Sequence, residues 1–300
     1  MEGASPGLLR RRWRNLRYRV RRHTTAYARI LPALRGAEHV LPDFLIIGSM
    51  KCGTTSLFHY LMQHPGIFGP SDKEVHFLNN PRYFRLGVNW YRSHFPTIKL
   101  MEERSAALGY TAVSGEATPT MMSHFYAINA AQIIPQAKLI VSLRNPVDRA
   151  YSHYHHMQRS FIGETLPFWE ALHAEDQRIG QDMTLNAMDP SKVGREYMRW
   201  SYKHRGMYID QIEFWLQHFP REQLLILNYE DLVSDTGAVC NQVCDFLGVP
   251  EFDFETSNKR NTGHYTEPMD ERSREYLTEL FRPYNRRLFD FLGEDWGWPA

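Results

Sequence analysis

The sequence predicts a single α/β domain: a P-loop-like central parallel sheet with helices on both faces. Short apolar runs at residues 44–47 and 139–143 are typical of buried parallel strands, and residues 221–229 are also expected to form a strand. A helical pattern follows each run, and this alternation of strand and helix is how parallel sheets are connected. The chain has 300 residues, 43% of them apolar, which is enough to bury one substantial core.

The first strand, residues 44–47, leads into a loop with the chemistry of an anion cradle. Gly48 and Gly53 bracket this loop, and residues 54–56 open a helix whose free N–H groups and positive dipole end suit a phosphate. A Walker A loop carries its lysine directly after the second glycine, whereas here the lysine is Lys51, before that glycine. The loop therefore argues against an ordinary nucleoside triphosphatase. A plain strand-to-helix turn is the alternative.

A second phosphate site follows the strand at residues 139–143. Arg144 stands at the carboxyl end of this strand, where open α/β sheets place their ligands. An Asn-Pro pair breaks the strand, and a helical pattern resumes over residues 148–156. Ser152 lies about one turn into that helix, where it can share a phosphate with Arg144. An ordinary turn with a surface arginine is the alternative here.

Together the two segments resemble the sulfotransferases that use 3′-phosphoadenosine 5′-phosphosulfate (PAPS). The K-x-G-T-T-S-L run at residues 51–57 is similar to their 5′-phosphosulfate loop, and the L-R-N-P-x-D-R-A-Y-S-H run at residues 143–153 to their 3′-phosphate motif. The resemblance begins near Leu41 and looks closest to the carbohydrate branch, which includes heparan sulfate sulfotransferases. It implies PAPS as cofactor and PAP as product. The cofactor contacts that it implies in these two segments are Lys51, Cys52, Gly53, Thr54, Thr55, Ser56, Arg144 and Ser152.

A later segment carries the third set of expected cofactor contacts. A basic loop that contains glycine can close over an anionic nucleotide through charge and backbone N–H groups. The run N-K-R-N-T-G-H at residues 258–264 has this composition and resembles the loop that covers PAPS late in the family's chains. The expected contacts are Lys259, Arg260, Asn261, Thr262 and Gly263.

Glu74 and His76 are the candidates for the catalytic base. They alternate at strand spacing, so both can line one face of an extended segment, although a solvated surface strand is the alternative. Transfer to a hydroxyl needs a group that takes its proton. A K-E-x-H-F segment holds the base in the heparan sulfate branch, which implies Glu74 as base and His76 as its assistant. The expected mechanism is in-line displacement in which Lys51 neutralises charge on the bridging oxygen, with no metal ion.

The acceptor is less well defined by the sequence. Residues 115–119 resemble a G-E-K-[ST]-P block, but Ala117 stands where the resemblance expects a lysine, and Asn79 replaces an acidic residue of some relatives. A neutral or weakly charged saccharide or glycoconjugate is therefore the first expectation, ahead of a lipid alcohol and an amine. Two other classes stay open: a P-loop small-molecule kinase and a non-catalytic PAP- or PAPS-binding adaptor.

Residues 1–40 form an Arg-rich extension ahead of the expected sulfotransferase domain at residues 41–300. Ten arginines against two glutamates give the extension a charge of +8, which leaves −7 for the remainder of a chain of net charge +1. Residues 10–35 can form a cationic amphipathic helix on an anionic membrane surface, a disordered or loosely packed arm, or an organellar transit peptide. No apolar run reaches 18 residues and the cysteines are few and scattered, so the expected location is cytoplasmic, either free or at the periphery of a membrane. Nucleic acid is not expected as a partner.

The rest of the chain is expected to be mainly scaffold. Aromatic residues between 87 and 96 are read as core or lid packing. Helices are expected at residues 167–177, 207–219 and 230–247, with a polar loop over 180–190 that is either an acceptor lid or an idle surface loop. A final helix over residues 273–292 is expected to break before Pro283, because proline has no N–H to continue it.

Overall fold

The computed structural model describes residues 33–123, 126–160, 163–188, 194–257 and 267–300. In this part of the chain five strands form one parallel sheet in the order β2-β3-β1-β4-β5. The strands are β1 Phe44–Gly48, β2 Ile67–Phe68, β3 Val113–Ala117, β4 Lys138–Leu143 and β5 Leu224–Asn228. The predicted α/β domain with a central parallel sheet is confirmed.

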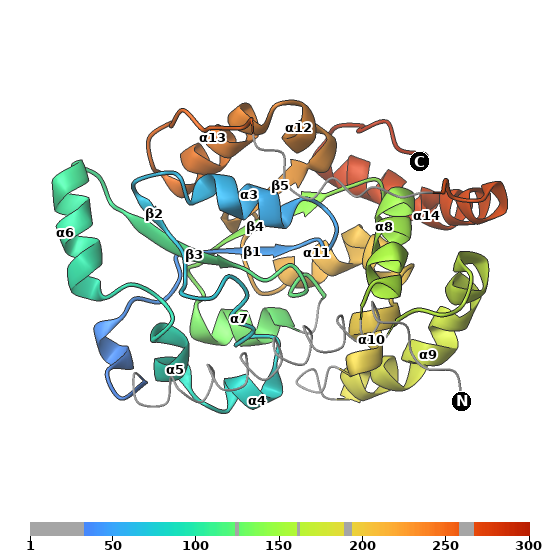
Figure 1. Ribbon diagram of the computed structural model, residues 1–300, viewed down its shortest axis with the longest axis horizontal. Coiled ribbons are helices and arrows are strands. Elements are labelled where there is room, and N and C mark those ends of the chain that lie inside the picture. The colour runs from blue at the N-terminus through green and yellow to red at the C-terminus, as the bar shows by residue number, and fades with distance from the viewer. Residues whose placement is uncertain (1–32, 124–125, 161–162, 189–193, 258–266) are drawn as a thin grey trace, which may run out of the picture.

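Helices cover both faces of the sheet. Figure 1 shows α3, α12 and α13 on one face and α4, α5 and α7 on the other, with α8, α9, α10 and α14 grouped beyond one end of the strands. Their bounds are α3 Thr54–Leu61, α4 Pro81–Phe84, α5 Val88–Arg92, α6 Ile98–Leu108, α7 Ala127–Ile133, α8 Pro146–Gln158, α9 Phe168–Met188, α10 Arg195–Trp200, α11 Tyr208–Leu216, α12 Tyr229–Ser234, α13 Thr236–Leu247 and α14 Glu271–Leu292. Three short 3-10 helices, η1 Gly36–Glu38, η3 His204–Gly206 and η4 Arg221–Gln223, also lie in the described ranges.

The central strand β1 separates two apolar cores. Phe44 and Ile46 pack into the core beneath α3 and α13, whereas Leu45 and Ile47 pack into the larger core on the opposite face. This division follows from strand geometry, because successive side chains point to opposite faces of a sheet. All four side chains are buried, which explains why the strand reads as a continuous apolar run.

The strand order brings three loops together at one edge. The chain moves from β1 to one side for β2 and β3, then crosses to the other side for β4 and β5. The carboxyl ends of β1, β3 and β4 therefore meet at the point where the strand order reverses, which is where open α/β sheets bind ligands.

Three expected elements differ in the structure. The helix α14 continues through Pro283, so the expected break there is wrong; Phe281 and Leu288 are buried on its inner face, and their packing supports the helix across the missing hydrogen bond. The expected single helix over residues 230–247 is two helices. Asp235 separates them, because its side chain accepts a hydrogen bond from Ala238 N at 3.0 Å and so begins α13.

The expected polar loop over residues 180–190 is also wrong for most of its length. Helix α9 continues as far as Met188, well past the end expected near residue 177. Gly180 lies inside this helix, where it costs about 1 kcal/mol relative to alanine but does not break the helix. Residues 180–188 therefore do not form the loop that was considered as an acceptor lid, because they belong to helix α9.

Part of the Arg-rich extension packs on the domain. Val40 N donates to Pro96 O at 3.1 Å, and a Cβ added to Gly36 would lie 2.2 Å from Asn89 O on α5. Residues 36–40 are thus fitted closely to α5, while most of the predicted membrane segment, residues 10–35, lies outside the described residues. None of the described helices is long and apolar enough to cross a membrane.

Candidate functional site

The loop between β1 and α3, residues 49–53, is a tight turn fixed to the sheet. Ser49 N donates to Ser142 O of β4 at 2.7 Å, and Cys52 N donates to Ser49 O at 3.2 Å. Lys51 and Gly53 both have a φ of 75°, in the left-handed region that non-glycine residues rarely adopt. The fold therefore holds Lys51 in an unfavourable backbone conformation directly before the N-terminus of α3, which fits a functional position for this lysine.

Cys52 is engaged inside the loop. Its side chain is 0% exposed, its carbonyl accepts a hydrogen bond from Ser142 Oγ at 2.7 Å, and its Sγ lies 3.8 Å from the Tyr208 hydroxyl. Burial raises the pKa of the Cys52 thiol, which disfavours the reactive thiolate. The thiol therefore packs against Tyr208 inside the protein. The expected contact of Cys52 with the cofactor stays a prediction.

The second predicted phosphate segment lies beside this loop. Arg144 follows β4, and its guanidinium lies 5.0 Å from the centre of the Tyr229 ring. Asn145 caps α8, since its Oδ1 accepts a hydrogen bond from Val147 N at 3.0 Å. Ser152 lies on α8 and is 2% exposed. The expected helix over residues 148–156 is confirmed, starting two residues earlier and ending two later.

Tyr208 connects the two segments. Its hydroxyl donates to Arg144 O at 2.9 Å and also contacts Cys52 Sγ. Tyr208 lies on the helix expected over residues 207–219 and is buried there, but the role of its hydroxyl was not predicted. Helical periodicity shows which face of a helix is buried and carries no information about the partner of a buried hydroxyl.

Positive charge collects around Lys51. Burial and the nearby charges of Arg159 and Arg144 lower the pKa of Lys51 from its ordinary value. Desolvation, Lys51 and Arg159 lower the pKa of His156 to about 4. Cations that destabilise one another in this way favour an anion between them. Ser152, His156 and Arg159 are spaced i, i+4 and i+7, and this helical spacing was the sequence signal that could have identified the last two.

The candidate base pair is joined to the first turn of α3 through Lys73. Its Nζ donates to Thr55 Oγ1 at 3.1 Å and to Glu74 Oε1 at 3.3 Å. Glu74 Oε2 lies 3.1 Å from His76 Nε2. The structure thus brings Glu74 and His76 together, and places them next to the first turn of α3.

The extended strand expected for Glu74 and His76 is wrong, because residues 73–76 are irregular. His76 has a φ of 58°, in the left-handed region, which turns its ring back towards Glu74. On its other side, His76 Nδ1 lies 3.0 Å from Asn79 Oδ1, while Asn79 Nδ2 donates to Thr120 Oγ1 at 2.7 Å. Since the amide oxygen faces the imidazole, His76 Nδ1 carries a hydrogen.

The aromatic residues of the segment at 87–96 are core. Trp90, Tyr91 and Phe95 are buried, and the Tyr91 ring stacks on Phe77 with 4.5 Å between the ring centres. The core packing that was expected for this segment is therefore confirmed.

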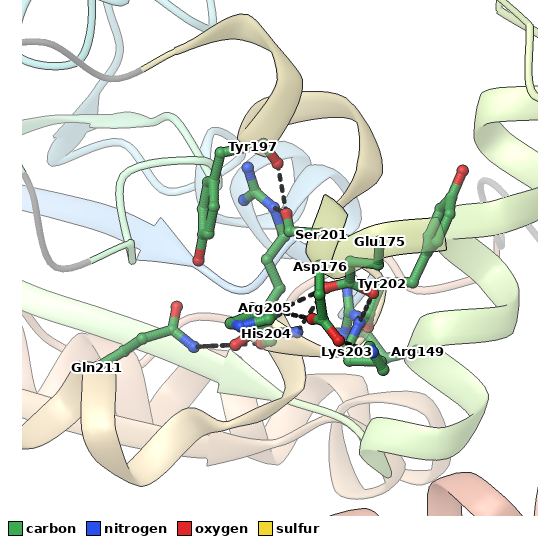
Figure 2. A network of polar contacts seen from close by, with 10 residues as sticks. All are labelled: Arg149, Glu175, Asp176, Tyr197, Ser201, Tyr202, Lys203, His204, Arg205 and Gln211. Atoms are coloured by element: carbon green, nitrogen blue, oxygen red, sulfur yellow. Dashed lines mark hydrogen bonds and ion pairs between the residues drawn. The ribbon is translucent and has the colours of Figure 1, made fainter. Parts of the chain in front are cut away.

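A buried polar network supports the chain ahead of α11 (Figure 2). Glu175 of α9 accepts hydrogen bonds from Lys203 N, His204 N and His204 Nδ1 at 2.7, 3.0 and 2.8 Å. The Lys203 ammonium pairs with Asp176 at 2.8 Å, and the Arg205 side chain is buried. These basic residues are therefore used inside the protein.

Other features lie apart from this site. A crevice of about 440 Å³ opens at the opposite edge of the sheet, beside Asp43 and Lys138. Within the described residues, no group of three or more His, Cys, Asp or Glu side chains is arranged to hold a metal ion. The third set of expected cofactor contacts lies outside the described residues: Lys259, Arg260, Asn261, Thr262 and Gly263.

Known proteins share this architecture and sequence. The family model described as a sulfotransferase domain matches residues 41–274. The membrane-associated sulfotransferase kil1 of Dictyostelium discoideum is 27% identical over 95% of this chain and 72% of its own length. The human bifunctional heparan sulfate N-deacetylase/N-sulfotransferase 3 is 32% identical over 84% of this chain, which spans only 30% of that protein. A sulfotransferase crystal structure from Alicyclobacillus acidocaldarius is 32% identical with a TM-score of 0.63, covering 85% of this chain and 97% of that one.

Proposed function

The chain belongs to the sulfotransferase family, and we propose that it transfers the sulfuryl group of PAPS to a hydroxyl of a saccharide or glycoconjugate. The observation that carries this proposal is the link from Thr55, in the first turn of α3, through Lys73 to Glu74 and His76. It supports a proton acceptor close to the helix N-terminus that would hold the phosphosulfate. A donor group and an acceptor hydroxyl can meet at this point.

Each end of the donor has residues suited to it. The N-terminus of α3 and Lys51 would hold the 5′-phosphosulfate, while Arg144 and Ser152 would hold the 3′-phosphate. The positive charge of Lys51, Arg144 and Arg159 supports this assignment, because a nucleotide with a 3′-phosphate is strongly anionic.

The transfer itself is a displacement at sulfur. The acceptor oxygen attacks sulfur as the bond from sulfur to the bridging phosphate oxygen breaks, and PAP leaves with that bonding pair. Glu74 takes the proton of the attacking hydroxyl, and Lys51 neutralises the charge that grows on the departing phosphate. His76 orients the Glu74 carboxylate through their 3.1 Å contact. This scheme uses side chains and backbone dipoles and requires no metal.

The acceptor class rests on the relatives and on one substitution. The name of the human relative supports a saccharide acceptor, and it also makes an amine the second candidate. Ala117 ends β3 and is 0% exposed, so this position offers no charge to an acceptor. A weakly charged saccharide is therefore favoured over a densely sulfated one.

The decisive experiment is calorimetric binding of PAP, PAPS and ATP-Mg²⁺ to the wild type and to Arg144→Ala, followed by transfer of labelled sulfate to an acceptor panel. Tight PAP binding that Arg144→Ala weakens at least tenfold, with ATP ignored, is the expected result. Preference for ATP-Mg²⁺ contradicts the proposal and indicates a kinase. PAP binding without transfer to saccharides, lipid alcohols or amines indicates an adaptor.

We also propose that residues 10–35 bring the enzyme to anionic membrane surfaces. Ten arginines in this segment and the name of the Dictyostelium relative support the idea. The full chain should sediment with phosphatidylserine vesicles at low salt, and a variant with five of these arginines changed to serine should not. Equal sedimentation of both chains contradicts the proposal.

A further inference from the structure

A fully buried carboxylate lies directly behind the candidate base pair. Glu116, near the end of β3, is 0% exposed. Its Oε2 accepts hydrogen bonds from Val75 N at 3.2 Å and Thr118 Oγ1 at 2.8 Å, and its Oε1 accepts one from the Tyr91 hydroxyl at 2.6 Å. All three bonds run towards the carboxylate, which is the pattern of an ionised acceptor.

The Val75 amide is the point at which Glu116 acts on the site. Val75 lies between the two members of the base pair, so its N–H belongs to the peptide bond that follows Glu74. His76 comes next, in its left-handed conformation. A non-glycine residue stays in that region only where the surrounding structure fixes it, and such strain is concentrated at functional sites.

The segment at residues 116–120 holds the base segment at two points. Glu116 holds Val75 N on one side of His76, and Thr120 holds the Asn79 amide, which contacts the imidazole, on the other. These two contacts set the direction of the backbone through His76 and the orientation of its ring. Burial, with a smaller contribution from the charge of Glu74, raises the pKa of the Glu116 carboxyl.

We propose that Glu116 is a positioning residue, which holds Glu74 and His76 in their working geometry through the Val75 amide. This inference rests on the proposed function, in which that pair accepts the proton of the acceptor. Glu116 is buried and does not touch the reactants. Its removal should therefore lower the rate of the chemical step and leave the binding of the donor unchanged.

The test compares Glu116→Gln with a matched control, Glu175→Gln. Glu175 is also 0% exposed and accepts three hydrogen bonds, but it lies on α9 in the network of Figure 2. In both variants the amide offers one acceptor oxygen, and its NH₂ group faces a donor. Both should lower the thermal unfolding midpoint. Only Glu116→Gln should lower kcat, at least tenfold, with KM for PAPS and Kd for PAP within threefold of wild type.

Two outcomes overturn the inference. One is a kcat of Glu116→Gln within threefold of wild type. The other is an equal loss of kcat in Glu175→Gln, which would mean that general destabilisation lowers the rate. If Glu116→Gln does not fold, Glu116→Asp keeps the charge but withdraws the carboxylate by one methylene, and the same loss of kcat is expected.

A second readout separates this inference from the proposed function. The ring signals of His76 can be followed by NMR over a pH titration, and the variant His76→Asn assigns them. Glu116→Gln should change the position and titration of these signals, whereas Glu175→Gln should leave them unchanged. If the wild type binds PAP but transfers to no acceptor, the proposed function fails, yet the ring signals still decide the role of Glu116. Unchanged His76 signals in Glu116→Gln overturn it.

Discussion

Removing one hydroxyl, in Tyr208→Phe, should weaken both the fold and the binding of PAP. That hydroxyl donates to Arg144 O at 2.9 Å, in a region where Tyr208 and Cys52 are fully buried. Its removal leaves the carbonyl without this donor, and a buried unsatisfied acceptor costs about 1–3 kcal/mol. The free energy of unfolding should fall by about that amount. Since Arg144 loses the bond that fixes its backbone, we also expect PAP affinity to fall about three- to tenfold.

Urea unfolding and calorimetry measure the two effects. The matched control is Tyr151→Phe, whose hydroxyl donates to Glu267 O and Pro268 O in exposed bonds of 3.0 and 3.2 Å. Water replaces an exposed bond, so this control should lose less than about 0.5 kcal/mol. The reasoning is refuted if Tyr208→Phe loses no more stability than the control. It is also refuted in part if stability falls but PAP affinity does not, because the hydroxyl then serves the core alone.

Three further changes have expected results. Lys51→Ala should lower kcat about 100-fold or more, because the lysine neutralises charge in the transition state; rates within a few-fold of wild type would exclude that role. The pKa of His156, lowered to about 4, means that the unfolded chain binds a proton between about pH 6.5 and 4 that the folded chain does not. Stability should therefore fall as the pH falls through this range, and less steeply in His156→Asn, in pH-dependent urea titrations. Gly206→Ala should cost about 1–3 kcal/mol in thermal unfolding, because its Cβ would lie 2.6 Å from the Phe281 ring; an unchanged midpoint would mean that the ring moves freely.

The parts of the fold that the sequence predicts are those set by local pattern. The strands at residues 44–47 and 139–143 are continuous apolar runs because both of their faces are buried. The helix through Pro283 could not be predicted, since packing of residues distant in the sequence outweighs a local rule. The start of α13 did have a local signal, because aspartate is a common helix-capping residue and Asp235 caps this helix. The helical pattern continues on both sides of Asp235, so the boundary was missed.

The candidate site also has parts that the sequence predicts and parts that only the fold defines. Lys51 and Arg144 could be proposed from the sequence, because a phosphate loop and a strand end have recognisable short motifs. Tyr208 and Glu116 were not identified, because their hydrogen-bond partners lie 64 and 41 residues away in the chain. A sequence shows that such a residue is polar, but the partner is defined only by the fold. The left-handed conformation of His76 was missed for the same reason.

The expected donor contacts and the expected acceptor side differ in how closely they are tied to the fold. The expected donor contacts around Lys51 belong to consecutive residues that also fix the turn between β1 and α3, so a change there disturbs the fold as well as the cofactor. The acceptor side is made where residues 73–79 meet residues 116–120, two segments joined by a few side-chain contacts. A substitution at Asn79, which lies outside the strands, can alter the charge of that side without changing the sheet, whereas Ala117 is buried within β3. Donor use should therefore be shared more widely among similar chains than the acceptor.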